Sequence, residues 1–210
     1  MIKLTEAILG LGLLLSPAIA SAQPITLTFE DLSFDHATEF PPISDGYGGF
    51  EWVSTRVINP SMYSGGGYDT LFGGGVVSGT NVAINGPGMT ISANTLFDFN
   101  GGYFSSGDGD PVSLWISGYQ NGGQVFIQEL VFYPGPAQYH AFDNLVQVDT
   151  LVFEASKYGT APPIFAVFTM DDLSFNVVPI PEPETYALML AGLGLVGFVA
   201  RRRKQQVTCL

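Results

Sequence analysis

Cysteine is almost absent from this chain. Its one cysteine, Cys209, is the second-last of 210 residues, so no disulfide can form within the chain. We expect Cys209 to lie beyond the folded part, which leaves that part without a thiol nucleophile. The folded part must therefore be stabilised by core packing or by a bound metal ion.

Basic residues are also scarce, with seven Lys and Arg against 19 Asp and Glu and a formal net charge of −12. Four of the seven are consecutive at residues 201–204. Between residues 23 and 178 only Arg56 and Lys157 are basic and sixteen residues are acidic, a net charge of −14. Nucleic acids and anionic lipids need clustered cations, so this charge argues against both as partners and favours divalent cations as counterions.

Few groups suit catalysis. The two histidines, His36 and His140, are not at a metal-binding spacing, and no Gly-x-Ser-x-Gly hydrolase motif occurs. We therefore assign no catalytic residue and predict a protein that is not an enzyme. Paired carboxylates for glycoside hydrolysis stay open, because their separation cannot be read from sequence. Asp108 and Asp110 have the alternate spacing of a calcium loop, but no Glu closes that loop, which favours a simple turn.

The first 22 residues have the features of a secretory signal peptide. Lys3 precedes an apolar run at 7–15, and the small residues Ala20, Ser21 and Ala22 follow. This order predicts export by the general secretion machinery, with cleavage after Ala22 or, as a second choice, after Ala20. The alternative is a buried N-terminal helix.

The C-terminal segment has three parts in order: Pro181-Glu182-Pro183, an apolar stretch at 186–200, and the basic cluster Arg201-Arg202-Arg203-Lys204. Proline keeps the first part extended. As a helix the apolar stretch is about 22 Å long, whereas a comfortable span takes about 20 residues. It predicts a short transmembrane helix, with the cations and residues 205–210 on the cytoplasmic side.

This order of parts resembles the PEP-CTERM sorting signal, with Pro181-Glu182-Pro183 matching its signature tripeptide. The resemblance covers residues 179–204. It implies that an exosortase recognises the tripeptide, removes the helix and basic tail, and releases the protein or attaches it at the cell surface. The expected location is the inner membrane before processing, then the cell surface or the extracellular space.

Residues 23–178 are expected to form one all-β domain, a jelly roll or β-sandwich. Their Gly, Phe, Tyr, Thr and Val content and frequent turn signals predict strands without long helices. The predicted strands are 25–29, 49–55, 76–84, 89–93, 96–104, 112–119, 124–133, 138–142, 149–155 and 164–176, the last with a break near Met170. Such a series of strands is typical of a sandwich or jelly roll.

A hairpin at 112–133 is the clearest local unit. Aliphatic residues at 112, 114 and 116 alternate with Ser113, Trp115 and Ser117, so one strand face is apolar. Asn121 and Gly122 then tolerate the positive φ of a tight turn. In contrast, the glycine triplets at 65–67 and 73–75 lack the partners of a phosphate-binding loop and predict a surface loop that displays Tyr63, Tyr68 and Phe72.

The segment at 29–34, Phe-Glu-Asp-Leu-Ser-Phe, nearly repeats at 170–175 as Met-Asp-Asp-Leu-Ser-Phe. The alternatives are a chance similarity and two strands that face the same core. First and last strands of a jelly roll commonly lie side by side or face each other. That arrangement would bring together Glu30, Asp31, Asp171 and Asp172, and four carboxylates repel unless a cation such as Ca²⁺ lies between them. We therefore predict a structural calcium site at these four residues.

The domain is similar in outline to the jelly-roll ectodomains found upstream of PEP-CTERM signals and to carbohydrate-binding modules, where a structural Ca²⁺ often lies near the chain ends. The candidate ligand contacts are aromatic residues that can stack on sugars: Trp52, Tyr63, Tyr68, Trp115 and Tyr119. We predict a surface or matrix protein that binds extracellular polysaccharide. The alternatives are a secreted carbohydrate-active enzyme and a self-associating structural surface protein.

Overall fold

The computed structural model describes residues 23–33, 40–63, 67, 71–142, 146–177 and 189–197. Residues 22–178 form one compact unit. The predicted signal peptide at 1–22, the sorting tripeptide and the basic cluster lie outside the described residues.

This unit is built from β-strands and short 3₁₀ helices. The strands are β1 (Gln23–Leu27), β2 (Glu51–Ile58), β3 (Val82–Ser106), β4 (Val112–Gln120), β5 (Gly123–Phe132), β6 (Gln138–Ala141), β7 (Val148–Lys157) and β8 (Phe168–Val177). The 3₁₀ helices are η1 (Tyr47–Gly49), η2 (Pro60–Tyr63) and η3 (Gly73–Gly75). The predicted all-β class is confirmed.

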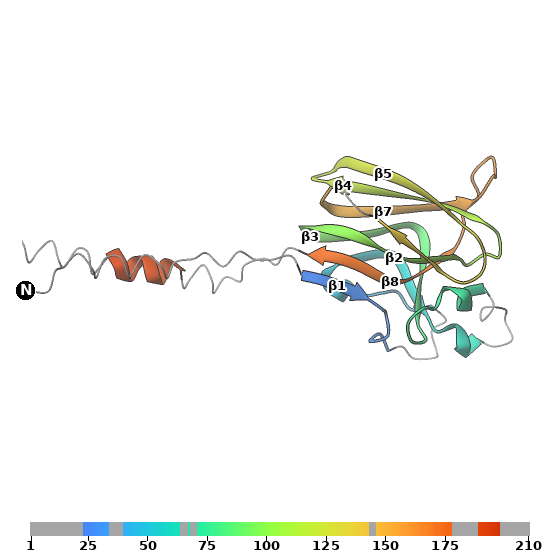
Figure 1. Cartoon of the computed structure of the whole chain (residues 1–210), viewed down its shortest axis with the longest axis horizontal. Coiled ribbons are helices and arrows are strands. Elements are labelled where there is room, and N and C mark those ends of the chain that lie inside the picture. The colour runs from blue at the N-terminus through green and yellow to red at the C-terminus, as the bar shows by residue number, and fades with distance from the viewer. Residues whose placement is uncertain are drawn as a thin grey trace, which may run out of the picture. The chain divides into compact units, whose positions relative to one another are not determined.

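All strand pairs are antiparallel, in the order β1-β8-β3-β7-β4-β5, and β2 and β6 also pair with β3. The 25-residue β3 joins the two layers of the sandwich. Its first half pairs with β2 and β7, and its second half pairs mainly with β8 and β6. Figure 1 shows β4, β5 and β7 in one layer and β1 and β8 in the other. The prediction that the first and last strands are neighbours is confirmed, because β1 pairs with β8.

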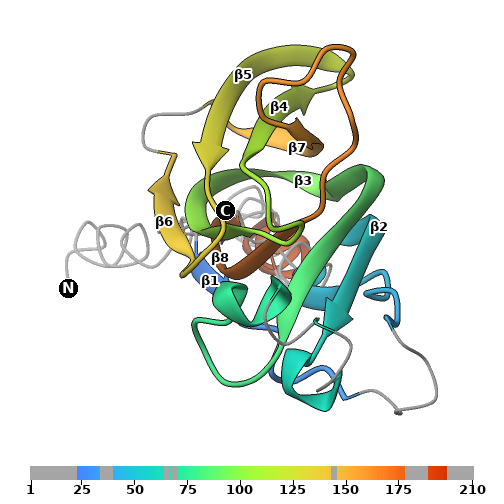
Figure 2. The same cartoon turned by 90° about the vertical axis from the view of Figure 1, so that its right-hand side faces the viewer.

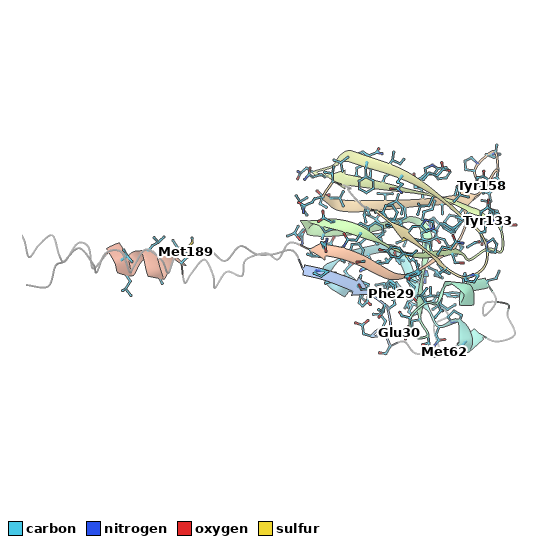
Figure 3. The ribbon with its side chains drawn as sticks, in the orientation of Figure 1. Phe29, Glu30, Met62, Tyr133, Tyr158 and Met189 are labelled. Atoms are coloured by element: carbon cyan, nitrogen blue, oxygen red, sulfur yellow. The ribbon has the colours of Figure 1, made fainter. Side chains whose placement is uncertain are left out.

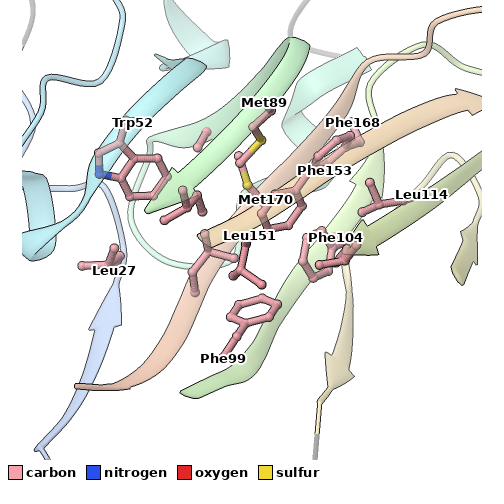
Figure 4. Packing of buried hydrophobic residues seen from close by; sticks show 14 of the residues in the cluster. Leu27, Trp52, Met89, Phe99, Phe104, Leu114, Leu151, Phe153, Phe168 and Met170 are labelled. Atoms are coloured by element: carbon pink, nitrogen blue, oxygen red, sulfur yellow. The ribbon is translucent and has the colours of Figure 1, made fainter. Parts of the chain in front are cut away.

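Phenylalanine fills the core between the layers. Nine of its largest fully buried side chains are Phe. Phe153 on β7 lies 6.3 Å from Phe99 on β3 and 6.4 Å from Phe168 on β8, measured between ring centroids. Figure 4 shows these rings between the strands. Such aromatic contacts across the layers add to the large apolar area that each ring buries.

The β4–β5 hairpin forms as predicted. The inward side chains Val112, Leu114 and Ile116 are fully buried. Asn121 and Gly122 have φ of 50° and 77°, as a type I′ turn requires at both central positions. A register shift between Gly118 and Tyr119 then adds one residue to β5.

Two predictions at residues 71–84 are corrected by the structure. Residues 76–81 are not a strand, because their amides hydrogen-bond to carboxylates instead of to a neighbouring strand. Phe72 is not displayed on a surface loop: it is buried with Ile58, Val82 and Ile84 in a second, smaller core. Burial of an apolar ring outweighs the flexibility that the flanking glycines suggest.

The C-terminal segment contains a helix at 189–197 with exposed side chains. It lies within the stretch predicted as a transmembrane helix, 186–200. Within the described part of the chain, no helix has both the length and the apolar character that a membrane span needs.

Candidate functional site

The outward face of β4 carries two of the predicted ligand contacts. Ser113, Trp115, Ser117 and Tyr119 alternate with the buried inward residues and point away from the core. Trp115 and Tyr119 are partly exposed, whereas the two serines are buried. The structure therefore brings these two aromatic residues onto one face of one strand.

Two glutamates flank the tryptophan. The residue paired with Trp115 on β5 is Glu129, and the residue paired with it on β7 is Glu154. Directly paired residues lie on the same face of a sheet, and both glutamates are exposed. Strands are about 4.8 Å apart, so the two glutamate Cα atoms are about 9.6 Å apart with Trp115 between them. We call Trp115, Glu129 and Glu154 the tryptophan site.

The register that places Glu129 here includes one extra residue on β5. At the hairpin turn Tyr119 pairs with Gln124, but after the shift Gly118 pairs with Phe126. The Phe126 ring packs directly against Gly118: an added Cβ atom would lie 2.1 Å from a ring carbon, so the ring would have to shift. Without the extra residue, Gln128 would pair with Trp115 and Glu129 would point to the opposite face.

The neighbouring side chains make a mixed surface. Next to the tryptophan site lies an apolar row in which Ser117 pairs with Ile127 and Val152, and Ile127 is 59% exposed. Figure 2 shows β4, β5 and β7 side by side in one layer. The exposed Tyr133 and Tyr158 lie at one end of this layer (Figure 3).

The two carboxylates of the tryptophan site have few protein partners. Ser113 Oγ donates to Glu129 Oε1 at 3.2 Å, and no described residue donates to Glu154. Both basic residues of the 22–178 unit are engaged elsewhere: Lys157 Nζ lies 2.7 Å from Asp110 Oδ2, and Arg56 donates to the Phe40 carbonyl. Within the described part of the chain, neither glutamate is neutralised by a cation.

The other aromatic candidates differ. Trp52 is a core residue, only 6% exposed, with its ring Nε1 donating to the Tyr47 carbonyl at 2.9 Å, so its prediction as a ligand contact is wrong. Its indole packs edge-on against Phe29 and Phe50. Figure 4 shows it directed toward the interior. The side chain of Tyr63 and the whole of Tyr68 lie outside the described residues.

Two of the four acidic residues hold a single loop. Asp171 Oδ2 accepts from the Val77 and Ser78 amides at 2.8 and 2.9 Å. Glu30 Oε1 accepts from the Thr80 and Asn81 amides at 2.9 and 2.6 Å. Glu30 and Asp171 occupy equivalent positions in the two copies of the repeated segment. We call these four hydrogen bonds the amide clamp. Figure 3 places Glu30 beside Phe29 at the edge of the domain.

The remaining two acidic residues are used differently. Asp31 Oδ1 accepts from the Tyr47 hydroxyl at 2.8 Å, and that hydroxyl accepts from the Phe29 amide. Burial and the contact with Asp31 raise the pKa of Tyr47. Asp172 takes φ of 48°, and its buried Oδ1 has no partner among the described residues.

The predicted convergence of Glu30, Asp31, Asp171 and Asp172 on one calcium ion is therefore contradicted. Within the described ranges, no three acidic, histidine or cysteine residues are grouped so that they could hold a metal. The physical reason is that backbone amides and a tyrosine hydroxyl satisfy three of the carboxylates. Burial raises the pKa of Asp171 despite its amide contacts.

The other polar candidates are structural. His140 packs against both Phe104 and Phe132, and its Nε2 has no partner in the described part of the chain. Burial lowers the pKa of His140. Asp108 accepts from the Val167 amide at 2.9 Å. Since Asp110 pairs with Lys157, the segment at 108–110 is a turn, as preferred from the sequence. His36 lies outside the described residues.

A shallow pocket of 260 Å³ opens beside the amide clamp. It is lined by Asn59, Pro60, Ser61, Gly73, Val76, Gly79 and Thr80. Its lining residues include no charged or titratable side chain, so it offers no group for acid, base or metal chemistry.

Comparisons with known proteins identify the tail. Residues 179–204 match the family described as "PEP-CTERM protein-sorting motif". The chain carries a PEP-CTERM sorting signal. This motif implies an exported protein that an exosortase sorts, and it confirms the interpretation of the C-terminal segment from sequence. No match was found among curated proteins.

A solved structure shares the fold of this chain. A DUF4465 family protein from Bacteroides caccae aligns with a TM-score of 0.55 at 11% identity, over 73% of this chain and 98% of that one. The arabinose-bound MgGH51 α-L-arabinofuranosidase aligns with a TM-score of 0.39 at 9% identity, over 76% and 27%. TmCBM61 in complex with β-1,4-galactotriose aligns with a TM-score of 0.29 at 9% identity, over 64% and 90%.

Proposed function

We propose that this exported PEP-CTERM protein is a non-enzymatic surface or matrix protein that binds polysaccharide through the tryptophan site. The observation that supports the proposal is a partly exposed indole in the outward face of the sheet, with an exposed carboxylate on either side. The C–H face of a sugar packs on such a ring. Carboxylate oxygens accept hydrogen bonds from its hydroxyls.

The environment of the two carboxylates favours binding over hydrolysis. A glycosidase needs one carboxylic acid that burial keeps protonated, next to a second carboxylate in a cleft. Glu129 and Glu154 are both exposed on the sheet surface. No described residue supplies the apolar enclosure that a general acid requires, so hydrolysis of a bound polysaccharide is not expected.

The test is binding of the purified full-length chain, in non-ionic detergent, to the exopolysaccharide of its own host by affinity electrophoresis. We expect Trp115→Ala to weaken the retardation by about fivefold or more, since aromatic stacking contributes about 1 kcal/mol or more. Tyr139→Ala is the control, because Tyr139 is also exposed, at 49%, but pairs with the second half of β3 in the other layer. Equal retardation of wild type and Trp115→Ala would refute the proposal, and release of reducing sugar would show a hydrolase.

A further inference from the structure

We propose that the tryptophan site binds a sugar that carries a protonated amine, in preference to neutral sugars and uronic acids. This inference rests on the proposed function and adds the chemical class of the ligand. It begins from the charge of the site. Glu129 and Glu154 flank Trp115, and no cation among the described residues pairs with either.

An ammonium group fits this arrangement in two ways. It is attracted to the face of an indole, and it donates charge-assisted hydrogen bonds to a carboxylate. Paired side chains on neighbouring strands have Cβ atoms about 5 Å apart. An amine on a sugar stacked over Trp115 therefore reaches one glutamate or the other, whichever way the sugar is oriented.

The same charges select against the other sugar classes. A uronic acid would bring a third negative charge between Glu129 and Glu154, in a region of net charge −14. A neutral or N-acetylated sugar keeps the stacking but loses the ion pair. The Ser113 hydroxyl occupies only Oε1 of Glu129, so Oε2 remains available for an amine.

The apolar row beside the site fits a chain rather than a single sugar. Ser117 lies between Ile127 and Val152, one step along β4 from the tryptophan site. Both aliphatic side chains lie on the outward face, with Ile127 59% exposed. Neighbouring sugar rings can pack on this row while one amine is held at Trp115.

The test compares three oligosaccharides of equal length: glucosamine oligomers, N-acetylglucosamine oligomers and oligogalacturonate. Binding to the full-length chain in non-ionic detergent is measured by titration calorimetry at neutral pH. We expect the glucosamine oligomer to bind about tenfold more tightly than the N-acetylated one, and oligogalacturonate to bind most weakly. Glu129→Gln and Glu154→Gln should each weaken glucosamine binding by about two- to fivefold, the range for an exposed ion pair.

Glu51→Gln is the matched control. Glu51 is an exposed carboxylate on the outward face of β2, which is three strands away from Trp115 on β4, or about 14 Å measured across the sheet. It changes the net charge equally. If Glu51→Gln weakens glucosamine binding as much as Glu129→Gln does, diffuse attraction explains the binding and the inference is wrong.

The inference and the proposed function fail differently. Equal binding of glucosamine and N-acetylglucosamine oligomers, lost in Trp115→Ala, would overturn the amine preference and leave the sugar site intact. Binding of none of the three oligosaccharides, with host exopolysaccharide still retarded in a Trp115-dependent way, would also overturn the preference. If Trp115→Ala changes no sugar binding at all, both are wrong.

Discussion

Asp171 is the buried charged residue whose removal should damage the domain most. Its side chain is fully buried, its Oδ2 accepts from the Val77 and Ser78 amides, and its Oδ1 accepts from the Asp172 amide at 2.7 Å. Asp171→Ala leaves three backbone donors without this partner. It also releases half of the amide clamp and so loosens the loop at 76–81.

The expected loss is about 3 kcal/mol of the free energy of unfolding. A donor left unsatisfied in a buried position costs about 1–3 kcal/mol, but two of the three amides lie in a partly exposed loop where water can replace the carboxylate. In a domain of this size, 1 kcal/mol shifts the melting temperature by about 2–4 °C. Asp171→Ala should therefore melt about 6–12 °C below wild type.

Thermal unfolding followed by circular dichroism, together with urea titration, measures this difference. Asp171→Asn should lose less than Asp171→Ala, because its amide oxygen can keep the Val77 and Ser78 contacts. Asp172→Asn changes the charge by the same amount at a carboxylate with a buried, unpartnered Oδ1 and φ of 48°, where Asn is well tolerated. It should melt close to wild type. The reasoning is refuted if Asp171→Ala melts within 2 °C of wild type, or if Asp172→Asn is the more damaging change.

Three further outcomes are expected. Burial raises the pKa of Asp171 above its ordinary value of 3.8. The stabilisation that Asp171 contributes is therefore fully present below pH 3.8 and is lost as the pH rises through the raised pKa. Urea titrations at several pH values should show the stability of wild type relative to Asp171→Asn falling over this pH range. Tyr47→Phe should cost about 1 kcal/mol in the same assay, because the Phe29 amide loses its acceptor, whereas Tyr133→Phe, 60% exposed, should cost nothing measurable. Phe153→Ala should lower the free energy of unfolding by about 3–5 kcal/mol. Because this is a large part of the stability of an ordinary domain, cooperative melting should be lost. An unchanged melting curve would contradict the place of Phe153 in the core.

The strands were predictable because their side-chain period of two is visible in the sequence. The inward residues of β4 and the turn at Asn121 and Gly122 are local signals, and both are confirmed. The same period also identifies the correct role of Trp52, because Phe50 and Trp52 share one strand face and both are buried. Choosing Trp52 for its residue type alone overlooked this signal.

The glutamates of the tryptophan site were missed for two separate reasons. If the strand pairing at the hairpin turn continued without a shift, Trp115 would pair with Gln128. The register shift beside Gly118 pairs Trp115 with Glu129 instead. The clash that a Cβ on Gly118 would make with Phe126 is a contact between strands, so it has no local sequence signature. Glu154 comes from β7, a pairing across almost 40 residues that the sequence does not specify.

The calcium prediction failed for a related reason. The first and last strands lie side by side, as expected for a jelly roll, and the acidic residues follow β1 and precede the part of β8 that pairs with β1. What the sequence did not show is the loop at 76–81, whose free amides compete with a cation for the same oxygens. Asp171 and Glu30 each bind two consecutive amides, so neither needs a metal.

The two outer faces of the sandwich differ in what covers them, and this difference decides where a ligand can bind. On β8 the outward Thr169 is fully buried, and a Cβ on Gly75 would lie 2.1 Å from its hydroxyl oxygen, so η3 and the clamped loop close that part of the face. On the β4 layer the outward Ile127 is 59% exposed, and the glutamates beside Trp115 are exposed as well. The amide clamp fixes the cover on the first face, which leaves the second as the exposed sheet surface for the polysaccharide binding that we propose.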